Sequence, residues 1–187
     1  MISKLKLPDG EKLVPLPASK VRQAAGSTNQ TAKSATVTPA VCKTISLKAS
    51  SIPQDAAVGV GQAARSKVLL SLVMSKDTAE LKSRVTGARQ LLNSCSAVTL
   101  KTATATVHQT LKELSMAKVG DDSVAVLNVQ QTSGITVEMT QVSAVKGGRL
   151  VTITAVGKPE SASDLTVLGQ LATKALEATA TGGGATA

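Results

Sequence analysis

Few residues of this 187-residue chain could take part directly in catalysis. It contains one histidine, His108, and two cysteines, Cys42 and Cys95, and it has no Phe, Tyr or Trp. Any Ser-His-Asp or Cys-His mechanism would have to use His108. That residue lies among threonines in the alternating stretch TATVHQTL, on the polar side of an expected strand. Because no nucleophile elbow or thiol-protease signature surrounds it, the sequence argues against an enzyme.

Two short motifs could bind a cation or a phosphate. Asp121 and Asp122 in VGDDSV offer carboxylate oxygens, but calcium takes about six to eight ligands and no spaced acidic loop surrounds them, so we expect a polar turn. Gly59, Gly61 and Ala64 in GVGQAA match a G-x-G-x-x-A dinucleotide fingerprint. That fingerprint needs a helix after it, and a strand-like pattern follows here instead. We therefore expect a loop leading into a strand, no cofactor and no metal.

Cys42 and Cys95 lack the spacing and the histidine partners of a zinc site. Two interpretations remain open from the residues themselves. They are two buried free thiols, which are common in cytosolic proteins, or they form one disulfide between the N-terminal segment and the core. In the second case, closing a loop of about 54 residues would stabilise the fold by about 4 kcal/mol.

The positive charge is concentrated in the first part of the chain. The formal net charge is +9, and residues 1–50 hold eight Lys or Arg against two acidic residues. A basic segment of this kind is a solvated tail or a surface that attracts polyanions. The lack of aromatic rings removes the stacking platforms that single-stranded nucleic acid needs. No apolar run approaches the roughly 18 residues of a membrane span, and Pro8 and nearby charges interrupt any signal-peptide core.

Helical patterns are expected at three places. A short helix is expected in AVCKTISLKA after Pro39, and a longer one begins at Asp77 and Glu80, which form an Asp-x-x-Glu capping pattern, and ends at Cys95. Glu80 also stands four positions before Arg84, a favourable spacing for an ion pair. The apolar face of this helix consists of Leu81, Val85, Ala88 and Leu92. A last amphipathic helix in SASDLTVLGQLATKALEA buries Leu165, Leu168, Ala172, Ala175 and Leu176.

Strand patterns fill most of the remaining chain. A strand is expected from Gln62 on, with Arg65 and Lys67 on its polar side; its apolar side holds Val68, Leu70, Leu72 and Met74. Further strands are expected in KLVPLP (an edge strand), AVTLKTA, TATVHQTL, DSVAVLNVQQ, GITVEMTQVSAV and RLVTITAVG. Gly147-Gly148 connects the last two as a two-residue hairpin.

These elements predict an α+β fold, an antiparallel β-sheet with helices packed on one face. The threonine-rich face would then point to solvent or to a ligand. Three segments are expected: a basic, partly flexible segment over residues 1–36, an α+β domain over residues 37–178, and a disordered Gly/Ala/Thr tail over residues 179–187.

An ordered set of short motifs resembles the extracellular sensor domain of actinobacterial receptor-type serine/threonine kinases, the PknH-like family, and the stand-alone lipoproteins related to it. The motifs are VTPAVC, ARQLLNSCSAVTL, VGDDSVAV, VKGGRLVTITAVG and LGQLATKALEA. The likeness covers residues 37–178. The chain departs from the family in having no aromatic residues, which members often carry in strands and cleft, and in lacking the cysteines for the second disulfide that some members have.

The resemblance implies a structural disulfide between Cys42 and Cys95, and it matches Gly120, Asp121, Asp122 and Ser123 to a structural turn. It further implies a non-enzymatic, extracytoplasmic sensor-like or lipoprotein domain of the cell envelope. Such a domain would bind a small ligand or an envelope component in a cleft between sheet and helices, with a membrane tether N-terminal to this chain. The sequence assigns no ligand-binding residues. The alternative is a basic module that docks on a polyanion, such as anionic lipid, an envelope polymer or, less favoured, nucleic acid.

Overall fold

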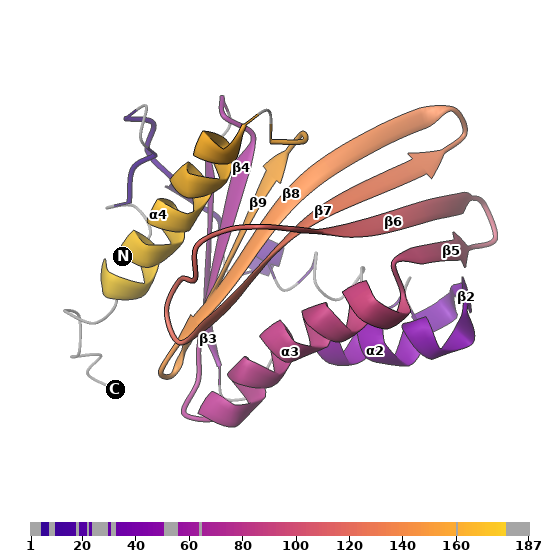
Figure 1. The fold of residues 1–187 in the computed structure, drawn as a ribbon, viewed down its shortest axis with the longest axis horizontal. Helices are drawn as coiled ribbons and strands as arrows, with labels where there is room; N and C mark the ends of the chain where they lie inside the picture. Colours follow the sequence, from indigo (N-terminus) through magenta and orange to yellow (C-terminus); the bar gives the residue numbers. More distant parts are fainter. Residues whose placement is uncertain are drawn as a thin grey trace.

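The computed structural model describes residues 5–7, 10–17, 19–21, 23, 30, 33–50, 56–63, 65–159 and 161–178. Within them, nine strands form one antiparallel sheet in the order β1-β3-β4-β9-β8-β7-β6-β5-β2 (Figure 1). The elements are β1 (Val14–Pro15), β2 (Thr36–Thr38), α2 (Ala40–Ser50), β3 (Ala57–Ala63), β4 (Val68–Met74), α3 (Thr78–Ser94), β5 (Ala97–Lys101), β6 (Thr106–Leu114), β7 (Asp122–Thr132), β8 (Ile135–Lys146), β9 (Arg149–Val156) and α4 (Ala162–Ala178).

One face of the sheet packs against α4. Leu168 and Leu176 of the helix are buried in one cluster with Ala125, Val142 and Ile153, which come from three neighbouring strands. All five apolar residues expected on this helix are buried. Each fully buried leucine of such a face contributes about 1.5–3 kcal/mol. Hydrophobic burial therefore fixes α4 on the sheet.

The other face of the sheet packs against α3. Val124 and Val126 alternate with Ala125 along β7, so they point away from α4, and they form a second cluster with Leu81 and Val85 of α3. The α+β class, the antiparallel sheet and the single disulfide are confirmed, but the placement of helices on one face is corrected to both faces. The physical reason lies in β7, where four consecutive apolar residues, Val124–Leu127, are buried on alternating sides.

The helix limits follow the expected capping pattern. Asp77 is the N-cap of α3, and its Oδ1 accepts a hydrogen bond from the backbone N–H of Glu80 at 2.9 Å. The helix ends at Cys95, whose own N–H donates to the carbonyl of Leu91 at 2.7 Å. The short helix expected after Pro39 is α2, and the expected edge strand in KLVPLP is β1.

The segment before β4 differs from the expectation. Gly59 and Gly61 lie inside β3, where they pair with Leu72 and Leu70 of β4, and not in a loop. Arg65 and Lys67, expected on the polar side of a strand, lie in the turn between β3 and β4. Glycine has no side chain that could reveal the alternation of a strand in the sequence. The strand forms here because this segment pairs with the apolar strand β4. Ala64 lies outside the described residues.

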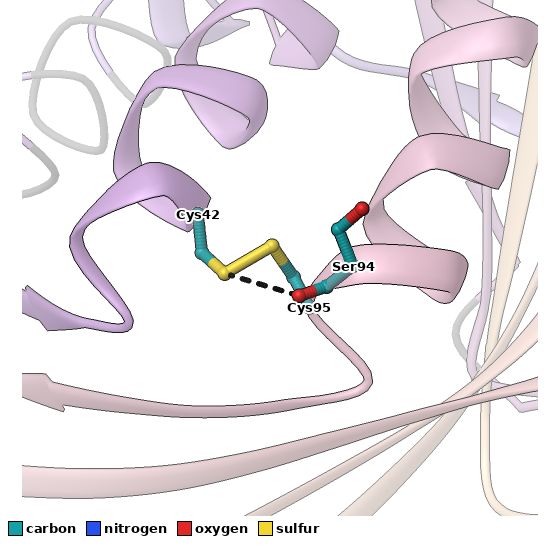
Figure 2. Close-up of a disulfide and its surroundings, with 3 residues drawn as sticks. All are labelled: Cys42, Ser94 and Cys95. Carbon is teal, nitrogen blue, oxygen red and sulfur yellow. Dashed lines mark hydrogen bonds between the residues drawn. A yellow bond between two sulfur atoms is a disulfide. The ribbon is translucent and has the colours of Figure 1, made fainter.

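A disulfide joins α2 to the end of α3 (Figure 2). Cys42 and Cys95 are fully buried, their Cα atoms are 5.7 Å apart, and Val98 of β5 completes the small cluster around them. Cys42 Sγ also lies 3.8 Å from the carbonyl oxygen of Ser94. The bond thereby holds α2 against α3 at one end of the sheet.

The remaining expectations concern the ends of the chain. The tail 179–187 lies outside the described residues, as does part of the basic segment 1–36, so both stay predictions. In the described part of the chain, no helix combines the length and the apolar character that crossing a membrane requires.

Candidate functional site

A cavity of about 230 Å³ lies between α3 and the face of the sheet that this helix covers. Ser46 of α2 reaches its edge. The apolar part of its wall is formed by Ala88, Leu91, Leu111, Val124, Val126 and Leu150. Polar side chains from the strands line the rest; they are Gln109, Asn128, Gln141, Ser143 and Thr152. A concave apolar surface with a few polar groups is the usual character of a small-molecule site.

Arg84 is the one charged residue among the described residues that line this cavity. It stands on α3 in the same stripe as Ala88 and Leu91, at the i, i+4 and i+7 positions, so the helix turns all three toward the cavity. Its Nε and Nη2 atoms are buried and have no hydrogen-bond partner among the described residues. A buried donor without a partner costs about 1–3 kcal/mol, and more when it is charged. Both nitrogens are therefore available to a hydrogen-bonding group that enters the cavity.

Asn128 is the second unpaired group of the cavity. Its Oδ1 atom is buried and accepts no hydrogen bond from any described residue. The polar residues beside it contact one another only at long range, since Gln141 Nε2 and Thr152 Oγ1 each lie 3.4 Å from Ser143 Oγ. The polar wall thus holds hydrogen-bonding capacity that the protein itself uses weakly.

The electrostatic setting of Arg84 is unusual for a surface helix. Burial lowers the pKa of its guanidinium, and the charge of Glu80 one turn earlier acts in the opposite direction. Arginine does not lose its proton in proteins, so the direction of this shift reflects a cation that is held partly out of water. The expected Glu80–Arg84 interaction is present as a charge effect, while Nε and Nη2 remain unpaired.

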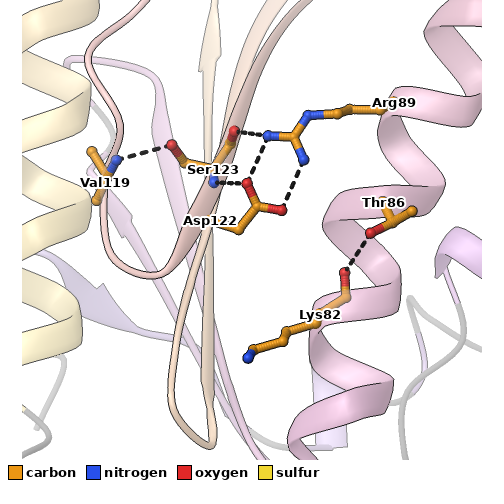
Figure 3. Close-up of polar contacts among 6 residues, drawn as sticks. All are labelled: Lys82, Thr86, Arg89, Val119, Asp122 and Ser123. Carbon is orange, nitrogen blue, oxygen red and sulfur yellow. Dashed lines mark hydrogen bonds and ion pairs between the residues drawn. The ribbon is translucent and has the colours of Figure 1, made fainter.

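A paired arginine on the same helix fixes the position of α3. Arg89 donates from Nη1 and Nη2 to both carboxylate oxygens of Asp122, at 2.8 and 2.7 Å, and from Nη2 to the carbonyl of Ser123 at 2.6 Å (Figure 3). These hydrogen bonds lower the pKa of Asp122 and raise that of Arg89. Ser123 Oγ accepts from the N–H of Val119 at 2.9 Å. The group links α3 to the first residues of β7, outside the lining of the cavity.

Of the expected Gly-Asp-Asp-Ser turn, Gly120 and Asp121 form the bend before β7, and Asp122 and Ser123 are the first residues of that strand. Asp121 Oδ2 accepts from the N–H of Gly147 at 2.8 Å, and the Asp121 N–H donates to the carbonyl of Val145 at 2.7 Å. The turn is thereby joined to the β8–β9 hairpin, in which Gly147 has a φ of +54°. Asp121 and Asp122 thus face different partners, and the described residues contain no group of three or more His, Cys, Asp or Glu placed to hold a metal ion.

His108 lies on the exposed side of the paired strands β5 and β6. It is exposed on β6, and its Nδ1 is 3.2 Å from Thr99 Oγ1 on the neighbouring strand. It lines an open depression between the β5–β6 and β7–β8 connections, and not the cavity beside α3. This position agrees with the exposed strand residue expected from the sequence.

A second, more open hollow of about 330 Å³ lies at the start of α4, on the other face of the sheet. It is mainly apolar, with Val68, Leu168 and Leu171 in its wall. The buried hydroxyl of Thr140 lines it and already donates to the carbonyl of Gly157 at 2.9 Å. Because this polar group is satisfied, the space at α4 lacks the unpaired buried atoms found beside α3.

Reasoning from the sequence missed Arg84 and Asn128 as site residues. Arg84 falls next to the apolar face of α3, between Leu81 and Ala88, and only this placement could have pointed to it. Asn128 interrupts an apolar alternation that begins with Val124 and Val126 on the same side of β7. A polar residue at such a position is a usable signal, because burial of an amide is costly unless it gains a partner.

No protein-family model and no curated protein sequence matches this chain. Among solved structures, the fold is similar to the extracellular domain of PknH from Mycobacterium tuberculosis, with a TM-score of 0.51 and 14% identical residues over 79% of this chain and 78% of that one. The likeness confirms, at the level of the fold, the resemblance expected from the sequence.

A second similar structure is that of a putative uncharacterized protein, an Rv0999 ortholog, from Mycobacterium smegmatis. It has 13% identical residues and a TM-score of 0.46 over 86% of this chain and 84% of that one. At this level of similarity it adds nothing to the argument.

Proposed function

We propose that this chain is a non-enzymatic, extracytoplasmic sensor-like domain that binds a small ligand in the cavity between α3 and the sheet. The observation that carries the proposal is the combination of a cavity with buried polar atoms of Arg84 and Asn128 that have no partner among the described residues. Proteins retain such costly groups where a ligand satisfies them.

Two further observations support this assignment. The fold is similar to a domain described as extracellular, and the disulfide between Cys42 and Cys95 suits an oxidising compartment. Binding also agrees with the chemistry of the cavity, whose wall contains hydroxyl, amide and guanidinium groups and neither histidine nor carboxylate. Such a wall orients a ligand but supplies no general base at neutral pH.

The location of the site can be tested by methyl NMR with a library of small organic fragments. The chain is rich in Leu, Val and Ala, so methyl groups report on both faces of the sheet. We expect fragments to shift the resonances of Leu111, Val124 and Leu150. Ala88→Leu, which fills the cavity, should remove these shifts.

Gln90→Leu is the matched control, because it adds a similar side chain at an exposed position of the same helix. It should leave fragment binding unchanged. Unshifted resonances of Val151 and Ile153 in the other core would show that both variants are folded. Shifts gathered on Leu168 and Leu171 would move the site to α4 and overturn the proposal.

The compartment is tested by mass spectrometry of protein exported through its native route. An alkylating reagent should leave the chain unmodified before reduction and modify both Cys42 and Cys95 after it. Modification of both cysteines without reductant would contradict an extracytoplasmic location.

A further inference from the structure

Two of the nitrogens of Arg84 define the chemistry of what the cavity can bind. Nε and Nη2 lie on one edge of the planar guanidinium, and their N–H bonds run nearly parallel. This edge matches two oxygens of one carboxylate or phosphate group, which it binds with a pair of charge-assisted hydrogen bonds. Both nitrogens of this edge are without a partner among the described residues.

Arg89, on the same helix, has a carboxylate partner of the kind that Nε and Nη2 of Arg84 lack among the described residues. Arg89 has its carboxylate within the chain, since Asp122 binds it through both oxygens. Arg84 lies on the same helix. Among the described residues, Glu80 is the carboxylate whose charge affects the pKa of Arg84, and Nε and Nη2 have no hydrogen-bond partner there. A guanidinium that is partly buried beside a cavity, and whose Nε–Nη2 edge is unpaired within the described part of the chain, is suited to an external anion.

The strand paired with Asn128 carries an apolar stripe that starts beside the cavity. Met139 pairs directly with Asn128, and Val137 and Ile135 follow on the same side of β8 at period two. Ile135 is 62% exposed and Val137 is 39% exposed. An apolar stripe that begins beside the cavity and continues into solvent can accommodate the hydrocarbon part of a ligand.

We propose that the cavity binds an organic anion, with its carboxylate or phosphate group on the Nε–Nη2 edge of Arg84 and its apolar body along the β8 stripe of Met139, Val137 and Ile135. This inference rests on the proposed function, because it specifies the ligand class for the same cavity. A volume of about 230 Å³ admits a charged group with a short chain, so a longer chain extends over the stripe.

The test measures affinity by methyl NMR for acetate, butyrate, hexanoate and octanoate, and for hexyl phosphate. Hexanamide serves as the uncharged counterpart of hexanoate. We expect the acids to bind with affinity that rises with chain length, by at most about fifteenfold for each two methylenes. Hexanoate should bind at least about tenfold more tightly than hexanamide. Comparison of hexanoate with hexyl phosphate shows which of the two anionic groups the cavity prefers.

The variants separate the contact with Arg84 from a general charge effect. Arg84→Gln should weaken hexanoate binding about tenfold or more, and Arg84→Lys should restore only part of it, because an ammonium lacks the two parallel donors. Lys82→Gln is the matched control: it removes the same charge from an exposed position of α3, and it should change the affinity less than about twofold.

Three results would overturn the inference. The first is equal affinity for hexanoate and hexanamide. The second is an affinity for hexanoate that Arg84→Gln leaves unchanged. The third is that no acid, up to about 50 mM, shifts the resonances of Leu111, Val124 and Leu150. If uncharged fragments still shift these resonances, the inference fails while the proposed function stands. If no compound of either kind shifts them, the proposed function fails as well.

Discussion

Arg84 and Arg89 lie on the same helix but differ in their pairing, and we expect one to contribute to ligand binding and the other to the stability of the fold. Arg89 forms a bidentate pair with Asp122 and a third hydrogen bond to Ser123, so its charge is balanced within the fold. Arg84 has unpaired nitrogens beside a cavity. Substitutions at Arg89 are therefore expected to affect the stability of the fold, and substitutions at Arg84 are expected to affect ligand binding.

The ion pair of Arg89 and Asp122 predicts a stability difference that depends on pH. The pKa of Asp122 is lowered in the folded protein, so its contribution is present above the unfolded pKa and is lost as pH falls through the lowered folded value. We expect Asp122→Asn to cost about 1 kcal/mol at pH 7, since the side chains are 39% and 31% exposed and solvent screens the pair. Urea unfolding should show this cost vanishing in strong acid.

Arg89→Met provides the control for this prediction. In that background Asp122 has lost its arginine partner, so Asp122→Asn should lower the free energy of unfolding much less. The double-mutant cycle then isolates the interaction energy between Arg89 and Asp122. A cost that is equal in both backgrounds, or that persists in strong acid, would contradict the assigned role of the ion pair.

At the scale of secondary-structure elements, the disulfide is the main covalent support of α2. The bond closes a loop with a sequence separation of 53, for which the chain-entropy model gives a stabilisation of about 4 kcal/mol. We expect the double substitution Cys42→Ala and Cys95→Ala to lower the free energy of unfolding by about that amount. In hydrogen exchange, amides of α2 and β2 should lose more protection than those of β7 and β8. Equal loss throughout the sheet would contradict a local anchoring role.

The turn before β7 predicts a contrast between two glycines. Gly120 has a φ of +66°, and a Cβ there would lie 2.4 Å from the carbonyl oxygen of Val145, whereas Gly134 has a φ of +81° and no atom within 4 Å of that position. Gly134→Ala should therefore cost only the left-handed backbone strain, about 1 kcal/mol. Gly120→Ala adds a backbone clash and should cost about 3 kcal/mol or more, measured by chemical unfolding. Equal costs would contradict the close approach of the turn to β8.

At the scale of the whole molecule, the net charge of +9 raises the alternative of docking on a polyanion. The two modes of binding should differ in their response to salt. Between about 50 and 300 mM NaCl, affinity for heparin should fall steeply, as for any surface attraction to a polyanion. Hexanoate binding at Arg84 should fall much less, because a partly buried ion pair is screened less. A steep fall for hexanoate would place the anion on the surface instead of in the cavity.

Patterns of short range in the sequence predicted most of the elements. Asp77 and Glu80 marked the start of α3, Gly147-Gly148 marked the last hairpin, and the spacing of Leu165, Leu168 and Ala172 marked α4. These features depend on neighbours within a few residues, so they are visible without the fold. The two strand positions of Gly59 and Gly61 were missed, because their structure depends on pairing with β4.

The sequence by itself thus determined the class of the fold and most of the elements, but not β2 or β3, together with a resemblance that pointed to the pairing of Cys42 with Cys95. Only the tertiary structure decided that helices cover both faces of the sheet and that Arg84 and Asn128 meet at one cavity. Periodicity shows which side of an element is apolar, but the partner of that side comes from a distant part of the chain. For the same reason, only the folded structure shows that Nε and Nη2 of Arg84 have no hydrogen-bond partner within the described ranges.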